Sequence, residues 1–136
     1  MSGKNDLIFA LVEDSRTKEL ALISVHIMTI IFPEDLGVGK NLLKGAIGKF
    51  ENECASGVAI LGSIINGKPM FMISITEDVV ARNLHAGDLA KVVANILGGS
   101  GGGKATFAQG GGKSERADLL PIAINYSKVY VAENLR

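Results

Sequence analysis

The chain has 136 residues, in which 14 Lys and Arg balance 14 Asp and Glu, and 47% of its residues are hydrophobic. This length and composition are typical of one compact domain and exclude a chain that stays disordered for lack of apolar residues. The zero formal net charge excludes strong attraction of the whole chain to polyanions, so a nucleic-acid site would have to be a local patch. Cys54 is the only cysteine, which excludes a disulfide framework and is compatible with a reducing, cytoplasmic compartment.

The first apolar segments indicate strands. Residues 20–32 are rich in β-branched side chains that alternate with polar ones such as Ser24 and His26, which predicts a core strand. The run is too short for a membrane helix, which needs about 20 apolar residues, so no membrane partner is expected. Residues 1–18 form a leader of uncertain structure. Because residues 7–12 are apolar and turn-forming residues follow them, the leader is either a hairpin partner of the first strand or a frayed segment.

The middle of the chain combines a helix with a hairpin. Apolar residues recur at helical spacing from Leu43 to Cys54, which predicts a helix after the break at Pro33. The pair Asn66-Gly67 lies between two apolar runs, residues 58–65 and 70–76, and this is the strongest short signal for a β-hairpin.

The second half is predicted to contain helices around a loop. A short helix starts near Glu77, a second runs from Asp88 to a stop at Gly98, and a last one starts at about Leu119 with Asp118 as its cap. Eight of the 17 glycines lie in residues 98–112, which predicts a long loop because glycine is costly inside helices and strands. The expected fold class is α/β, a small mixed β-sheet covered by helices in the order β-α-β-β-α-loop-α, with residues 19–136 as one domain.

The glycine-rich loop is the candidate binding site. Successive backbone N–H groups in such a loop can converge on an anion, and Lys104, Lys113 and Arg116 would add cationic donors. A flexible tether, or a loop that packs on its own sheet, remains an alternative. Neither His26 nor His85 has a partner at metal-ligand spacing, so no metal ion, cofactor or catalytic group is expected.

Four segments, in this order and spacing, resemble the C-terminal domain of alanyl-tRNA synthetase, a member of the DHH-associated family. They are residues 62–68 (GSIINGK), 75–79 (ITEDV), 85–89 (HAGDL) and 98–112 (GGSGGGKATFAQGGG). The resemblance is specific from about residue 57 to 136 and rests on pattern alone from about residue 20 to 56. Lys104 stands where the related DHH phosphoesterases have a histidine, and the continuation through Ala108 and Gln109 looks like the synthetase branch. Ala105 and Thr106 depart from the proline and the acidic or amide residue that the synthetase motif usually has.

The resemblance implies a cytoplasmic module that binds alanine tRNA at its outer corner, where the D and T loops meet, beside the catalytic and editing domains of a parent synthetase. Such a module binds and does not catalyse, because the chain lacks the adenylate-forming core and the zinc-liganding editing histidines. The RNA-facing residues implied are Gly101, Gly102, Gly103, Lys104, Gln109, Gly110, Gly111 and Lys113, with His85 and Arg116 at the edge.

Two alternatives remain open. The chain could be the substrate-binding lobe of a DHH-type phosphoesterase, which would work beside a metal-binding domain. It could also be a dimerisation module that forms a homodimer, if the apolar strand at residues 20–32 is an exposed sheet edge.

Overall fold

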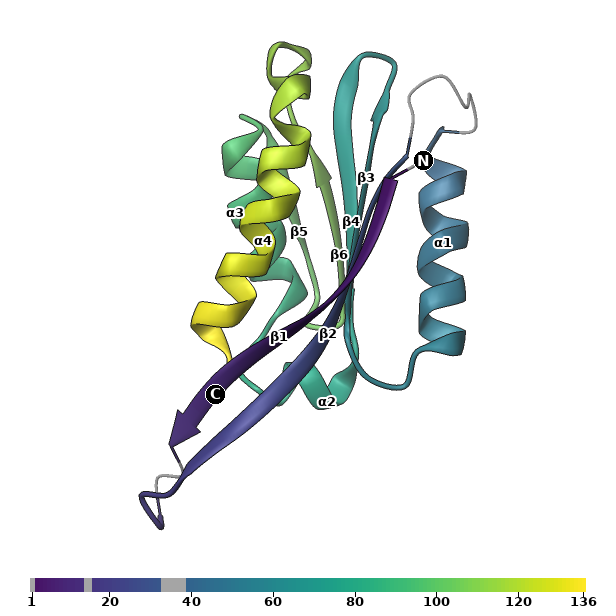
Figure 1. The fold of residues 1–136 in the computed structure, drawn as a ribbon. Coiled ribbons are helices and arrows are strands. Elements are labelled where there is room, and N and C mark those ends of the chain that lie inside the picture. Colours follow the sequence, from purple (N-terminus) through teal and green to yellow (C-terminus); the bar gives the residue numbers. More distant parts are fainter. Residues whose placement is uncertain (1, 14–15, 33–38) are drawn as a thin grey trace.

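The computed structural model describes residues 2–13, 16–32 and 39–136, and Figure 1 shows one twisted sheet between two helical layers. The strands are β1 (Ser2–Glu13), β2 (Leu20–Phe32), β3 (Val58–Ile65), β4 (Lys68–Ile75), β5 (Ser100–Gly103) and β6 (Phe107–Gly111). The helices are α1 (Gly39–Glu53), α2 (Glu77–Val80), α3 (Ala86–Ile96) and α4 (Leu120–Asn134), and a 3₁₀ helix, η2 (Ser114–Leu119), precedes α4.

In the part of the chain that the structure describes, the sheet has six strands in the order β1-β2-β3-β4-β6-β5. Only β2 and β3 are parallel; every other neighbouring pair is antiparallel. The parallel pair needs a crossover connection, and α1 provides it. The predicted fold class, a mixed sheet covered by helices, is therefore confirmed.

Two apolar cores lie on the two faces of the sheet. Side chains alternate along β4, so that Phe71, Ile73 and Ile75 join the core under α3 and α4, while Met72 joins the core under α1. Figure 1 shows α1 alone on one side of the sheet and α3 with α4 on the other. On its face of the sheet, α1 packs on β3 and β4, and Phe107 of β6 is partly buried against the same core.

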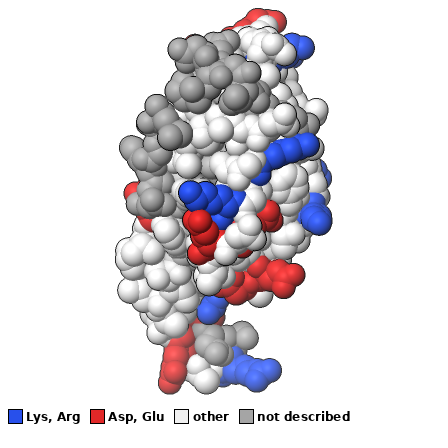
Figure 2. All heavy atoms as spheres, turned by 90° about the vertical axis from the view of Figure 1, so that its right-hand side faces the viewer, with Lys and Arg blue, Asp and Glu red and all other residues white. Residues whose placement is uncertain are grey.

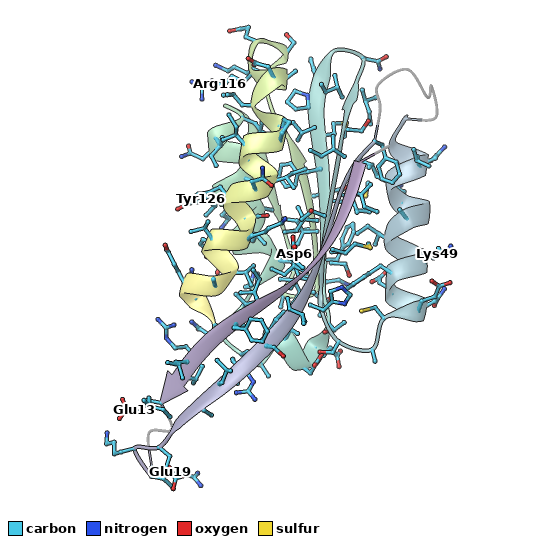
Figure 3. All side chains as sticks on the ribbon, viewed as in Figure 1. Asp6, Glu13, Glu19, Lys49, Arg116 and Tyr126 are labelled. Carbon is cyan, nitrogen blue, oxygen red and sulfur yellow. The ribbon has the colours of Figure 1, made fainter. Side chains whose placement is uncertain are left out.

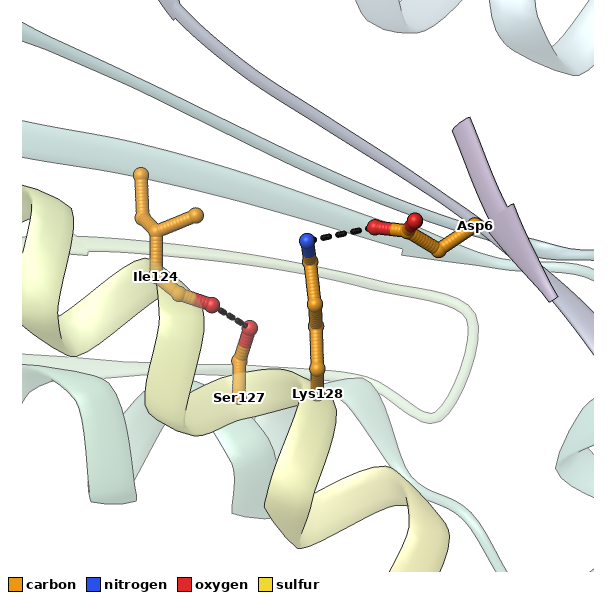
Figure 4. Close-up of polar contacts among 4 residues, drawn as sticks. All are labelled: Asp6, Ile124, Ser127 and Lys128. Carbon is orange, nitrogen blue, oxygen red and sulfur yellow. Dashed lines mark hydrogen bonds and ion pairs between the residues drawn. The ribbon is translucent and has the colours of Figure 1, made fainter. Parts of the chain in front are cut away.

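The apolar leader forms a strand. β1 pairs with β2 along its whole length, from Ser2 opposite Ile31 to Glu13 opposite Leu20. An ion pair ties it to the helical layer, since the Lys128 Nζ lies 2.6 Å from Asp6 Oδ2 (Figure 4). Figure 4 also shows the buried Ser127 hydroxyl, which donates to the Ile124 carbonyl one turn earlier in α4. The expectation that residues 20–32 form an exposed edge is wrong for residues 27–32, because β1 is the outermost strand and residues 27–32 pair with β3. Residues 20–26 pair with β1 alone among the described strands.

The expectation of a long glycine-rich loop is also wrong. Residues 100–111 form a hairpin of β5 and β6, and only Lys104, Ala105 and Thr106 lie between the two strands. Close packing demands glycine at several of these positions: a Cβ at Gly110 would lie 2.7 Å from Gly101 Cα, and one at Gly101 would lie 3.0 Å from the Ala90 carbonyl oxygen of α3. The low strand propensity of glycine is overridden because a larger residue would not fit there.

The remaining elements agree with the predictions from the sequence, except for local differences. The predicted hairpin turn is confirmed, with Asn66 and Gly67 both at positive φ (53° and 78°). The expected cap Asp118 is wrong, because the chain enters α4 from η2 and Leu119 takes the cap position without a side-chain hydrogen bond. The helix expected from Asp88 begins two residues earlier, at Ala86, and α2 ends at Val80.

Candidate functional site

Seven of the ten predicted binding residues lie in the glycine hairpin, which we define as residues 100–111, and the other three lie at its two ends. Lys104 N–H donates to the Phe107 carbonyl at 2.9 Å. Because hydrogen-bonded pairs alternate in an antiparallel ladder, the N–H groups of Gly101 and Gly103 are directed away from β6, toward the open edge of the sheet. The amides therefore point in alternating directions along a strand and do not converge as they would in an anion-binding loop.

The turn of the hairpin is docked on the first turn of α3. The Ala86 N–H donates to the Ala105 carbonyl at 2.9 Å, and the Gly87 N–H donates to the Lys104 carbonyl at 3.1 Å. A Cβ at Gly87 would lie 2.6 Å from the Gly103 carbonyl oxygen. Two of the donors that a helix N-terminus could offer to an anion are therefore used inside the protein.

His85 has a structural contact at this end. It is the cap of α3, and its Nδ1 accepts a hydrogen bond from the Asp88 N–H at 3.3 Å. The His85 side chain is 44% exposed, so it remains accessible to a ligand.

Arg116 and Lys113 lie at the other end of the hairpin, where α3 finishes. The Arg116 guanidinium covers Gly98, which has φ +72°, and donates from Nη1 to the Ile96 carbonyl at 3.2 Å. The Lys113 N–H donates to the Leu97 carbonyl at 3.0 Å, and its side chain is exposed. Figure 3 shows Arg116 at this end, on the side of the sheet opposite the outward-pointing Lys49 of α1.

The ten residues predicted from the sequence thus fall into three groups. Lys104 and His85 lie at the α3 N-terminal end, and Lys113 and Arg116 lie at the α3 C-terminal end. The others line the hairpin between them: Gly101, Gly102, Gly103, Gln109, Gly110 and Gly111. The five residues of β6 separate the two ends by roughly 13 Å, at about 3.3 Å per residue step. The two cationic groups therefore cannot hold the same phosphate.

An open cavity of about 740 Å³ lies at the Lys113 end, and we call it the end cavity. Its walls come from the β3–β4 turn, from the start of β5 and from the residues that follow β6. They include Asn66, Lys68, Pro69, Met70, Ser100, Gly111, Lys113, Ser114 and Glu115. Sequence analysis missed Lys68 and Ser100 as functional candidates, because only the pairing of β4 with β6 brings the Asn66-Gly67 turn beside the glycine hairpin.

A second cavity, of about 710 Å³, lies at the opposite end of β4 and is acidic. Four carboxylates line it, from Glu51, Glu53, Glu77 and Asp78, and so does Thr106 of the hairpin turn next to Lys104. The Ser56 hydroxyl donates to Asp78 Oδ2 at 2.5 Å, and Thr76 donates to Oδ1 at 2.5 Å. These hydroxyls hold the pKa of Asp78 below its usual 3.8, mainly through Ser56, so the group stays charged at neutral pH.

The charges therefore distinguish the two ends of the hairpin. A polyanion is repelled by the acidic cavity near Lys104, whereas Lys68 and Lys113 at the end cavity face one carboxylate, Glu115. Figure 2, which looks onto the α1 side, shows basic and acidic side chains interspersed among larger uncharged areas. That side has no broad basic field, which agrees with the zero formal net charge.

Within residues 2–13, 16–32 and 39–136, no helix is long and apolar enough to cross a membrane. The same described residues contain no group of three or more His, Cys, Asp or Glu side chains that could hold a metal ion.

Comparison with known proteins gives consistent matches. The family model for the DHHA1 domain matches residues 22–127. The alanine–tRNA ligase of Natranaerobius thermophilus is 46% identical over 87 residues, which cover 64% of this chain and 10% of that enzyme. The alanine–tRNA ligase of Acetivibrio thermocellus is 32% identical over 110 residues, which cover 81% of this chain and 12% of the enzyme. The chain thus spans about a tenth of the length of these relatives.

The fold has a counterpart among solved structures. The crystal structure of the C-Ala domain from Aquifex aeolicus alanyl-tRNA synthetase aligns with a TM-score of 0.67 and 24% sequence identity, over 79% of this chain and 92% of that one. The family model covers well over half of the chain, and the relatives that match are alanine–tRNA ligases. The chain therefore belongs to the DHHA1 domain family, in the part of it that is related to the C-terminal domain of alanyl-tRNA synthetase.

Proposed function

We propose that the chain is the tRNA-binding C-terminal domain of an alanyl-tRNA synthetase, and that it contacts the outer corner of tRNA in support of aminoacylation and editing by the parent enzyme. The observation that carries this proposal is the match to alanine–tRNA ligases, which reaches 81% of the chain in one relative. In this proposal the chain itself binds and does not catalyse. The catalytic and editing domains belong to the rest of a cytoplasmic parent enzyme.

The surface chemistry favours one part of the hairpin for the RNA contact. Phosphate contacts supply most of the affinity of proteins for nucleic acids, and they need cations that are not already neutralised. Lys113 is exposed beside the end cavity and is in no ion pair among the described residues. Lys104 is also exposed, but it lies next to the acidic cavity. We therefore expect Lys113 to contribute more to binding than Lys104.

The test is a salt-titrated binding assay of the purified chain with an alanine tRNA transcript. Two competitors separate the modes of binding: the same tRNA with its D-loop and T-loop contact disrupted, and a duplex RNA of equal length. We expect preference for the intact tRNA. Log affinity falls linearly with log salt concentration, and each lost phosphate contact reduces the steepness of this fall by roughly 0.7 to 0.9. Lys113→Glu should therefore weaken binding and make the salt dependence less steep.

Two variants complete the experiment. Lys104→Glu tests the residue that the sequence motif singles out, and Lys49→Glu, on the outer side of α1, is a control of equal charge change (Figure 3). Equal binding to all three RNAs would show that the chain binds RNA by nonspecific electrostatic attraction and does not recognise the tRNA corner. Absence of binding to any of them would refute it.

A second function, self-association, is favoured by an apolar surface on the β1–β2 ribbon. Five large side chains on one face of the ribbon are 58% to 68% exposed: Leu7, Phe9, Leu11, Leu20 and Leu22. They share this face because directly opposed residues in an antiparallel pair point the same way, as Leu11 and Leu22 do. β1 is also the outermost strand of the sheet and is twelve residues long, and two copies could pair there symmetrically.

Sedimentation of the chain over a range of concentrations tests this second function. Phe9→Glu should shift the species toward monomer if the ribbon joins two copies. Ile122→Glu is the matched control, because Ile122 is equally exposed, at 58%, but lies on α4. A monomer at all concentrations, or equal effects of the two variants, would exclude dimerisation through the ribbon.

A further inference from the structure

We propose that the end cavity binds one unpaired nucleotide of an RNA loop, with Lys68 holding its phosphate. This inference rests on the proposed tRNA-binding function and adds to it a site that lies mostly outside the glycine motif. The site exists only in the folded chain, because it combines the β3–β4 turn with the far end of the hairpin.

The size and position of the cavity suit a single nucleotide. Its volume of about 740 Å³ falls in the range of small-molecule sites, roughly 300 to 1,000 Å³. A base inside a duplex cannot enter such a site, whereas proteins that recognise RNA loops take up bases that are splayed out of the stack. The tRNA corner consists of loops, so the occupant fits the proposed partner.

The walls offer the two kinds of contact that a nucleotide needs. Ile65 and Met70 are partly buried and give an apolar surface, on which a base can lie against the polarisable thioether. The hydroxyl of Ser100 and the amide of Asn66 can bond to polar base edges or to a ribose hydroxyl. The cavity therefore places apolar contact beside hydrogen-bonding groups.

Two cations complete the site. Lys68 and Lys113 both line the cavity and are exposed, and neither takes part in an ion pair within the part of the chain that the structure describes. Glu115 offsets one of these charges, which leaves the lining with a net charge of +1 from two lysines and one glutamate. The acidic cavity at the other end of β4 carries four carboxylates and would repel the same ligand.

The backbone around the cavity is held in place by hydrogen bonds between strands. The Gly112 N–H donates to the Pro69 carbonyl at 3.0 Å, which fixes the hairpin end against the β3–β4 turn. A Cβ at Gly111 would lie 2.9 Å from the same carbonyl and 3.6 Å from Met70 Cγ. A side chain there would crowd the cavity wall, so glycine at this position keeps the cavity open.

The experiment uses the whole chain and the alanine tRNA transcript, with two variants of different kinds. Lys68→Ala removes a charge, and we expect about a five- to tenfold loss of affinity together with a salt slope lower by roughly 0.7 to 0.9. Ser100→Phe fills the cavity from the exposed edge strand, and we expect a similar loss of affinity with no change in the salt slope. Lys44→Ala, on the exposed side of α1, is the matched control and should bind like the wild type.

A second readout locates the nucleotide directly. Photo-crosslinking of tRNA that carries 4-thiouridine, followed by mass spectrometry, should join the RNA to peptides that contain residues 65–70 or 111–115. The cavity inference is overturned if Lys68→Ala and Ser100→Phe bind tRNA as tightly as the wild type and the crosslinks map elsewhere. The proposed function still stands in that case, provided that the wild type binds the intact tRNA selectively. If the wild type binds no tRNA, both fall.

Discussion

Two alanine substitutions in the glycine hairpin should have opposite effects on stability. A Cβ at Gly110 would lie 2.7 Å from each of three atoms: Gly101 Cα, the Ser100 carbonyl oxygen and Phe71 Cζ. Ordinary contact begins at about 3.4 Å, so neighbouring strands would have to separate by about 0.7 Å, and two of the three atoms belong to the backbone. We expect Gly110→Ala to cost about 1 to 3 kcal/mol, the usual range for an overpacked core.

Gly102 is the internal control, because a Cβ there would meet nothing within 4 Å. Its backbone is extended, so alanine fits without strain and mainly restricts the unfolded chain, which should stabilise the protein by about 0.4 to 1 kcal/mol. Urea and thermal unfolding measure both changes, and 1 kcal/mol corresponds to roughly 3 to 5 °C for a chain of this size. Equal destabilisation by the two variants would refute the argument that packing demands the glycines.

Three further predictions concern polar contacts. His85→Ala should cost about 1 kcal/mol of unfolding free energy through loss of the α3 cap, and His85→Asn, which can also cap, should restore it in the same urea titration. The depressed pKa of Asp78 contributes stability that is present above about pH 4 and is lost as the pH falls through the folded-state pKa, so Asp78→Asn should flatten the acid side of a stability–pH curve. Asp6→Asn should cost about 0.5 to 1.5 kcal/mol by removing the partner of the largely buried Lys128, and the difference from wild type should shrink in high salt.

The sequence predicts much of the fold where local signals and packing agree. The Asn66-Gly67 turn suffices for the β3–β4 hairpin, because both residues must adopt positive φ and few other pairs do so easily. The apolar positions of α4 are also predictable. Leu120, Ile124 and Val131 are buried, as helical periodicity indicates, and so is Leu135, which directly follows the helix.

The glycine hairpin could not be predicted, because its strands form against local propensity. What favours an extended chain at Gly101 and Gly110 is the close approach of α3 and β4, which depends on residues far away in the sequence. The expected arrangement of the candidate site changes as well, because a hairpin takes the place of the loop. A loop would bring Lys104 and Lys113 together, whereas a hairpin places them at opposite ends of β6, one of them beside the acidic cavity. Lys68 was missed because its place at the site depends on the pairing of β4 with β6.

The β2 strand combines two environments. Residues 27–31 pair with β3 as well as β1, whereas residues 20–26 have only β1 beside them among the described strands. Amide hydrogens in the first part should exchange with solvent only through large-scale unfolding, while those in the second part can exchange when the ribbon alone opens. One strand would then show a step in hydrogen-exchange protection near Ile27. The exposed apolar side chains of the β1–β2 ribbon lie in the part with lower protection. A partner that binds them could therefore change the conformation of this part of the ribbon without unfolding the core that supports the glycine hairpin.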